Sequence, residues 1–126
     1  MKKLIALILT ILCLTGCSPA DPGYTLSYDK TERMTLYEEY ECVAVYTKFT
    51  NSGEETVLPA DVAMVTAFQN GVELSPLVPS EEMNGYIQVD TKVQGGATAD
   101  VVWSFQLADN SPVSIEFSDG QKFEEG

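Results

Sequence analysis

The sequence predicts an all-β sandwich, and three observations support this prediction. Several runs of the 126-residue chain alternate apolar and polar residues with a period of two, which is typical of half-buried strands. Turn-forming Asn, Gly, Asp and Pro residues follow these runs about every ten to twenty residues. After the first twenty residues no stretch keeps a helical period. About six to eight short strands of this kind predict two packed sheets.

The first half of the chain contains the strand pattern and a hairpin signal. Residues 33–40 are expected to form the first strand. The next strand, 42–50, is expected to place Val43, Val45, Thr47 and Phe49 on one face and Ala44, Tyr46, Lys48 and Thr50 on the other. Residues 62–69 are apolar on both faces, which predicts a central strand. Asn70-Gly71 then predicts a tight hairpin, because both residues accept positive φ angles.

The second half predicts a loop over residues 76–85 and a short strand over 86–93. The strongest amphipathic strand is 98–107, with Ala99, Val101, Trp103, Phe105 and Leu107 on one side. A hairpin is expected from 113–117 to 122–123. The large aromatic residues are expected in the core: Phe49, Phe68, Trp103 and Phe105.

The first sixteen residues have the layout of a secretory signal peptide. Lys2 and Lys3 precede the apolar run 4–14, which is about 16 Å long as a helix and too short to cross a hydrocarbon core of about 30 Å. The run ends in Leu14-Thr15-Gly16-Cys17, which resembles a bacterial lipobox. That resemblance implies a diacylglyceryl group, with palmitate-type chains, on the Cys17 thiol. It also implies cleavage between Gly16 and Cys17, and a location on the outer face of the cell membrane.

The expected organisation is therefore a signal peptide over 1–16, a flexible tether over 17–29 and a β-sandwich over 30–126. The segment after Cys17 is rich in Pro, Gly and Ser, which is typical of a tether. The remaining chain has five basic and nineteen acidic residues, a formal charge of −14. Such acidity argues against nucleic acid as a partner, because phosphate binding needs a basic surface.

The residue types restrict the possible chemistry. The chain has no His, which excludes Ser-His-Asp and Cys-His catalysis and imidazole metal ligands. After cleavage Cys42 has no disulfide partner, and its position in a strand-like run predicts a buried structural thiol. No catalytic residue, metal ligand or cofactor is assigned.

Acidic residues leave two alternatives open. Four adjacent pairs occur: Glu38-Glu39, Glu54-Glu55, Glu81-Glu82 and Glu124-Glu125. Two carboxylates could support an enzyme acting on envelope polysaccharide, although neighbours on a strand point to opposite faces. A weak Ca²⁺ site could form from Glu54, Glu55 and Asp61, or from Glu81 and Glu82.

Three stretches in a fixed order resemble a family of immunoglobulin-like domains of unknown function on lipoproteins of Gram-positive bacteria. They are the strand ending in Phe49-Thr50-Asn51, the hairpin 69–74, and the turn Gly95-Gly96-Ala97 leading into the Trp103 strand. The resemblance covers about residues 25–118 and implies an immunoglobulin-like sandwich at the cell surface, with no activity attached. We therefore expect a lipid-anchored interaction module without catalytic activity, whose partner is a protein of the cell envelope.

Overall fold

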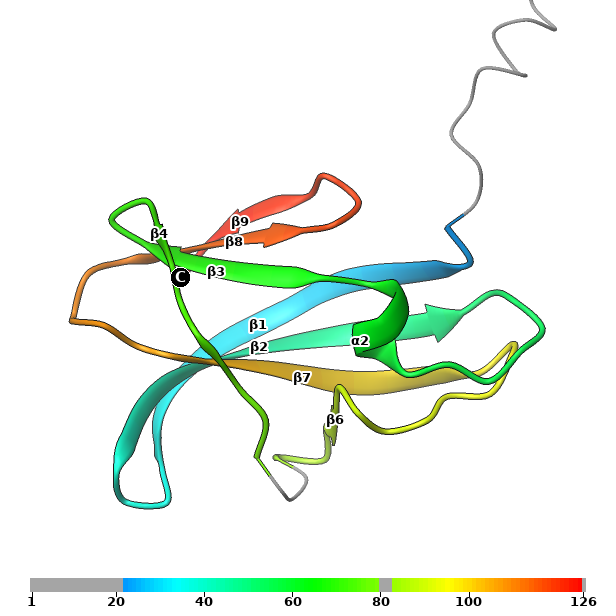
Figure 1. Ribbon diagram of the computed structural model, residues 1–126, viewed down its shortest axis with the longest axis horizontal. Helices are drawn as coiled ribbons and strands as arrows, with labels where there is room; N and C mark the ends of the chain where they lie inside the picture. Colours follow the sequence, from blue (N-terminus) through cyan, green and yellow to red (C-terminus); the bar gives the residue numbers. More distant parts are fainter. Residues whose placement is uncertain (1–21, 80–82, 126) are drawn as a thin grey trace, which may run out of the picture.

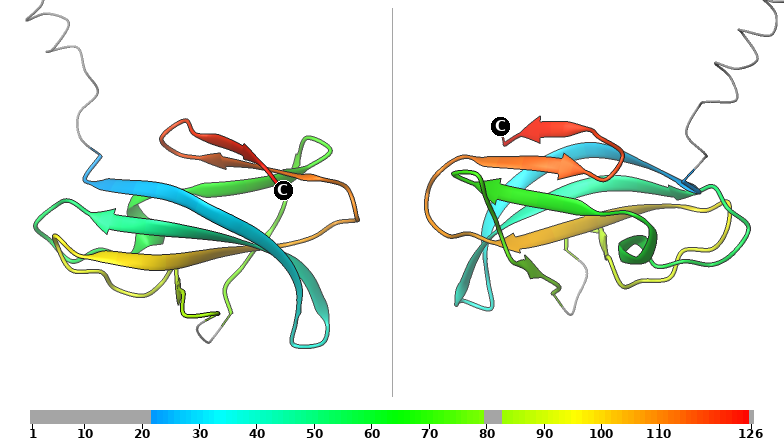
Figure 2. Two further views of the ribbon diagram at one scale, coloured as in Figure 1. Left: turned by 180° about the vertical axis from the view of Figure 1, so that it is seen from behind. Right: turned by 45° about the horizontal axis from the view of Figure 1, so that its top comes forward.

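The computed structural model describes residues 22–79 and 83–125, which form two sheets packed face to face (Figures 1 and 2). The first sheet has the order β1-β2-β7-β5, and β6 also pairs with β7. Its strands are β1 (Tyr24–Leu36), β2 (Tyr40–Asn51), β5 (Pro76–Leu77), β6 (Ile87–Gln88) and β7 (Thr98–Gln106). All of its pairings are antiparallel except the one between β6 and β7.

The second sheet has the order β4-β3-β8-β9, with every pairing antiparallel. Its strands are β3 (Val65–Gln69), β4 (Val72–Glu73), β8 (Val113–Phe117) and β9 (Lys122–Glu124). One helical turn, α2 (Pro59–Val62), joins β2 to β3. The predicted all-β sandwich is confirmed.

Strand β1 begins earlier than the sequence predicted. The tether was expected to reach residue 29 and the first strand to span 33–40, but β1 starts at Tyr24 and pairs with β2 along its whole length. The Tyr24 and Leu26 side chains are buried in the core, so this segment belongs to the sandwich. The sequence pattern hid the strand because the register shifts between Tyr28 and Lys30, and a bulge interrupts the period of two.

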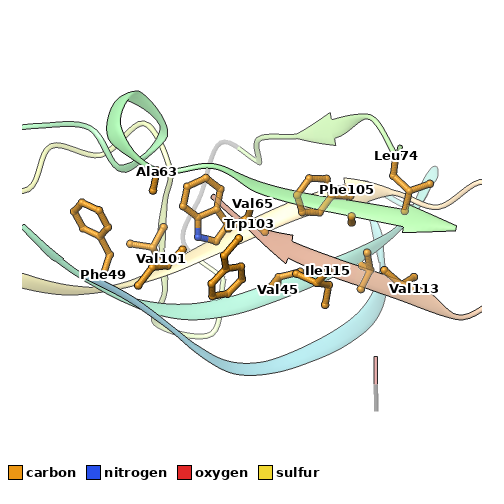
Figure 3. Packing of buried hydrophobic residues seen from close by; sticks show 14 of the residues in the cluster. Val45, Phe49, Ala63, Val65, Leu74, Val101, Trp103, Phe105, Val113 and Ile115 are labelled. Atoms are coloured by element: carbon orange, nitrogen blue, oxygen red, sulfur yellow. The ribbon is translucent and has the colours of Figure 1, made fainter. Parts of the chain in front are cut away.

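The core between the sheets follows the predicted faces of β2 and β7 (Figure 3). Val43, Val45 and Phe49 of β2 and Val101, Trp103 and Phe105 of β7 belong to one buried cluster. They meet Val65 and Ala67 of β3 and the inward-facing residues of β8, which are Val113, Ile115 and Phe117. Burial of these apolar side chains from both sheets provides most of the driving force for folding.

The prediction that Phe68 lies in the core is wrong. Residues Val65, Ala67 and Gln69 of β3 are buried, so the alternation places Phe68 on the outer face of the second sheet, where it is half-buried. The expected strand over 62–69 is also shorter than predicted. Pro59 starts the α2 turn, because its fixed φ suits the first helical position, and that turn takes up Val62.

Both faces of β2 are covered. On its outer face Ala44 and Tyr46 are buried together with Val102 of β7, and partly buried Met34, Met83 and Tyr86 pack against them. The Tyr46 and Tyr86 rings have centroids 4.5 Å apart. The segment after residue 82 therefore covers the outside of the first sheet before it enters β6.

The predicted Asn70-Gly71 hairpin is confirmed: both residues have positive φ angles, 54° and 78°, and Gln69 pairs with Val72. The expected strand over 86–93 shrinks to the two residues of β6 and two isolated bridges, Met83 with Tyr86 and Val57 with Val93. Part of the loop expected over 76–85 forms the short β5 strand.

Candidate functional site: an apolar pocket at the open edge of the sandwich

A pocket of about 260 Å³ lies between the two sheets at the edge formed by β5 and β6. One wall comes from the α2 turn and the start of β3, through Ala60, Ala63, Met64 and Val65. The other walls are residues 76–78, 88–89 and 102–105. Trp103 belongs to these walls, and Figure 3 shows it lying beside Val65 and Ala63.

The lining of the pocket is almost entirely apolar. Among the lining side chains only Gln88, Ser104 and the Trp103 indole have polar atoms, and none is charged. The Trp103 Nε1 donates to Thr47 Oγ1 at 3.0 Å, and Ser104 Oγ donates to Met83 Sδ at 3.8 Å. The pocket is therefore suited to an apolar group and holds no ionisable group that could move a proton.

Two exposed apolar side chains line this pocket, and a third directly precedes a lining residue in the sequence. The exposed fraction is 63% for Met64 and 52% for Val78, both of which line the pocket, and 37% for Val62 at the end of α2. Apolar side chains that gather at a concave site mark a contact surface more often than scattered ones do. This part of the surface is the best candidate for a binding site.

Some residues that the sequence singled out lie outside the described residues: Gly16, Cys17, Glu81 and Glu82. Within residues 22–79 and 83–125, no three Asp, Glu, Cys or His side chains come together as a metal site would require. Glu54, Glu55 and Asp61 accordingly do not form a ligand set. Weak Ca²⁺ binding and polysaccharide cleavage by two carboxylates stay predictions from the sequence alone.

Two carboxylates have pKa values below their ordinary range, and both serve the structure. Arg33 Nε donates to Glu125 Oε2 at 2.6 Å, and this hydrogen bond lowers the pKa of the Glu125 carboxyl. The Ser111 backbone N–H donates to Asp109 Oδ1 at 2.8 Å and lowers the pKa of Asp109. The first bond joins β1 to the residue after β9, and the second closes a turn within the 109–111 loop, whose Ser111 carbonyl accepts from Arg33 Nη2 at 2.7 Å.

Cys42 is fully buried, as its sequence context predicted. Burial raises the pKa of its thiol, because the thiolate would lose solvation. A buried thiol with a raised pKa is a poor nucleophile.

The pocket could not be predicted from the sequence. Met64 stands in a run that has the pattern of a continuous strand, and Val78 stands in an apparent loop. No local pattern marks either residue as part of a site, since the pocket exists only where the two sheet edges separate.

Comparisons with known proteins show a shared fold. One similar crystal structure is described as "a putative lipoprotein (ycdA) from Bacillus subtilis subsp. subtilis str. 168", with a TM-score of 0.53 and 10% sequence identity. The similarity covers 85% of this chain, which spans only 37% of that longer chain. No curated protein sequence matches the chain.

The described residues include no helix with the length and apolar character needed to span a bilayer. The family model described as a domain of unknown function, DUF5067, matches residues 21–119, which is most of the chain and nearly the whole described sandwich. The chain belongs to this DUF5067 family.

Proposed function

We propose that this protein is a lipid-anchored, non-catalytic binding module on the outer face of a bacterial cell membrane, and that the apolar pocket is its binding site. The observation that carries the proposal is the N-terminal sequence, in which a basic start and a short apolar run end in Leu14-Thr15-Gly16-Cys17. The description of a structurally similar protein as "a putative lipoprotein" agrees with it.

The start of β1 supports an anchor close to the domain. Cys17 stands seven positions before Tyr24, so an extended tether spans at most about 24 Å. The Gly23 carbonyl accepts a hydrogen bond from the Ser52 N–H at 3.0 Å, at the end of the sandwich opposite the β1–β2 hairpin tip (Figure 1). With this anchor, the hairpin tip would point away from the membrane.

The finer proposal is an immunoglobulin-like domain from a Gram-positive bacterium, and the strand order supports the immunoglobulin-like part of it. In their order across each sheet, β1, β2 and β7 are neighbours in one sheet, and β4, β3, β8 and β9 in the other. This arrangement corresponds to immunoglobulin strands A, B and E opposite C′, C, F and G. The domain has no inter-sheet disulfide among its described residues, where Cys42 is a free thiol.

The composition of the pocket supports binding without catalysis. Its lining side chains contain no carboxylate, amine, imidazole or thiol, so the lining offers no general base that could activate the Ser104 hydroxyl as a nucleophile. What it offers is apolar area in a concave shape, which favours binding of a partner group.

The test is the intact mass of the protein extracted from membranes, compared with the Cys17→Ala variant. We expect the wild type to begin at Cys17 and to carry a diacylglyceryl mass, and the variant to leave the membrane fraction or to stay unprocessed. Unlipidated wild-type protein in the culture medium would refute the anchor. Folding of both proteins is checked by circular dichroism.

A further inference from the structure

The edge of β3 beside the pocket has free backbone hydrogen-bonding groups. The Ala67 carbonyl accepts from the Leu74 N–H at 2.8 Å, so it points away from β8. Val65 stands two residues before Ala67 on β3 and is paired with Phe117 of β8. The Phe117 N–H points away from β3, because it donates to the Gln121 carbonyl on the β9 side. Because strand residues two apart point the same way, the Val65 N–H and C=O also face away from β8.

No strand among the described residues covers this position. β4 pairs only with Phe68 and Gln69 of β3, and Leu74 closes the ladder at Ala67. Within the described part of the chain, no residue makes a hydrogen bond to the Val65 backbone on this edge. Val65 is also part of the pocket wall, so an unpaired donor and acceptor lie beside an apolar cavity.

We propose that an extended peptide segment of a partner protein adds as a strand along β3 at Val65 and inserts an apolar side chain into the pocket. This inference rests on the proposed binding function and names its partner chemistry. Strand addition combines main-chain hydrogen bonds with pockets for alternate side chains, and this edge supplies both.

The pocket has room for one anchor side chain. An apolar cavity of about 150 Å³ is enough to hold benzene. At about 260 Å³ this pocket admits a Leu or Phe side chain, which the exposed lining residues Met64 and Val78 would contact. Since no lining side chain is charged, a charged anchor would lose its solvation without compensation.

Charge favours a basic peptide over a second copy of this chain. Exposed Asp61 and Asp90 directly follow the lining residues Ala60 and Val89 in the sequence, and exposed Glu73 lies on β4. Lys92 is a basic residue of this region and lines a second hollow together with Asp61. The whole chain has a formal charge of −12, so two copies repel each other. The peptide is therefore expected to carry Lys or Arg on either side of its apolar anchor.

Trp103 makes the test direct, because it is the chain's only tryptophan and lies in the pocket. The full chain, purified from membranes in amphipol, is titrated with a synthetic heptapeptide of alternating Lys and Leu, and Trp103 emission is followed. We expect a saturable emission shift that weakens as salt is added. A matched peptide with N-methylated backbone amides, which cannot complete the ladder, should bind at least tenfold more weakly.

A pair of variants tests the location. Ala60→Phe fills the pocket from its rim and should weaken binding at least tenfold, whereas Ala108→Phe, at an exposed alanine outside the pocket lining, should leave binding unchanged. Thermal melts establish that both variants fold. Saturable binding that depends on Ala60 and on the peptide amides supports the inference.

Four outcomes would overturn it: no emission shift at millimolar peptide, equal binding of the N-methylated peptide, equal binding by Ala60→Phe, or self-association in sedimentation that buries the pocket. Equal binding of the N-methylated peptide would indicate a site for small apolar groups without strand pairing. The membrane-anchoring proposal is judged separately by the Cys17→Ala mass measurement, so either proposal can fail alone.

Discussion

Trp103 and Thr47 are joined by a buried hydrogen bond: the indole Nε1 donates to Thr47 Oγ1 at 3.0 Å, and that hydroxyl donates to the Val101 carbonyl at 2.9 Å. Thr47 is fully buried and Trp103 is 6% exposed. The bond satisfies the only polar atom of the Trp103 side chain and fixes the ring in the wall of the pocket. The shape of the candidate site therefore depends on β2 as well as on β7.

Thr47→Val should destabilise the protein by about 1–3 kcal/mol, because it leaves the indole N–H buried without an acceptor. Urea unfolding measures the change. Thr50→Val is the matched control on the same strand: the Thr50 hydroxyl bonds Thr98 at the surface, so its loss should change the stability by less than about 0.5 kcal/mol. Equal effects of the two variants would contradict the role assigned to the buried bond.

Trp103→Ala should lower the free energy of unfolding by about 3–5 kcal/mol, since it removes the largest side chain from the contact between the sheets and enlarges the pocket. The comparison variant is Phe68→Ala, on the outer face of β3, which should cost clearly less. A reversed order of the two losses in urea melts would mean that the face of β3 is wrongly assigned.

Asn51→Ala should lower the free energy of unfolding by roughly 2–3 kcal/mol, because this one buried side chain forms hydrogen bonds with three backbone groups. Its Nδ2 donates to the carbonyls of Glu55 (2.7 Å) and Val93 (3.0 Å), and its Oδ1 accepts from the Gly53 N–H (3.0 Å). Thermal unfolding is the measurement, and exposed Asn110→Ala is the control. If amide exchange showed the 53–57 loop equally protected in Asn51→Ala and wild type, this role of Asn51 would be disproved.

Gly95→Ala should be strongly destabilising, by about 2–4 kcal/mol, for a steric reason. A Cβ atom at this position would lie 2.5 Å from the Glu54 carbonyl oxygen, and that backbone cannot move without disturbing the adjoining loop. At Gly53 the nearest atom would be 3.4 Å away, so Gly53→Ala should be tolerated much better. Similar melting temperatures for the two variants would rule out this close approach.

The Arg33–Glu125 pair should make part of the stability depend on pH. The hydrogen bond from Arg33 lowers the pKa of Glu125 in the folded state. The contribution of this pair to the free energy of unfolding is therefore complete above the unfolded-state pKa of a Glu carboxyl, about 4.3. It is lost as the pH falls through the lower pKa of Glu125 in the folded state. The difference in melting temperature between wild type and Glu125→Gln should be constant near neutral pH and shrink in acid.

Glu124→Gln provides the control for this prediction, because Glu124 is the exposed last residue of β9 and directly precedes Glu125. It should show no comparable pH dependence. A difference for Glu125→Gln that grows toward low pH would reverse the sign of the linkage and contradict the pair's role.

The strands with a clean period, and the faces they turn inward, were predictable from the sequence alone. Val43, Val45 and Phe49 face the core because alternation along a strand is a local geometric property. The Asn70-Gly71 turn was equally predictable, since few residue pairs accept two positive φ angles. Burial of Cys42 followed from its place within such a strand.

Features that depend on which surfaces meet could be known only from the packed molecule. Phe68 lies outside the core because the first sheet, which includes β2 and β7, packs on the opposite face of β3, and no local signal specifies that choice. The strands β5 and β6 have two residues each, too few for a period, and exist because β7 offers them a free edge. The pocket and the free Val65 backbone arise where these short strands and β3 end, so they are products of the packing of two sheets.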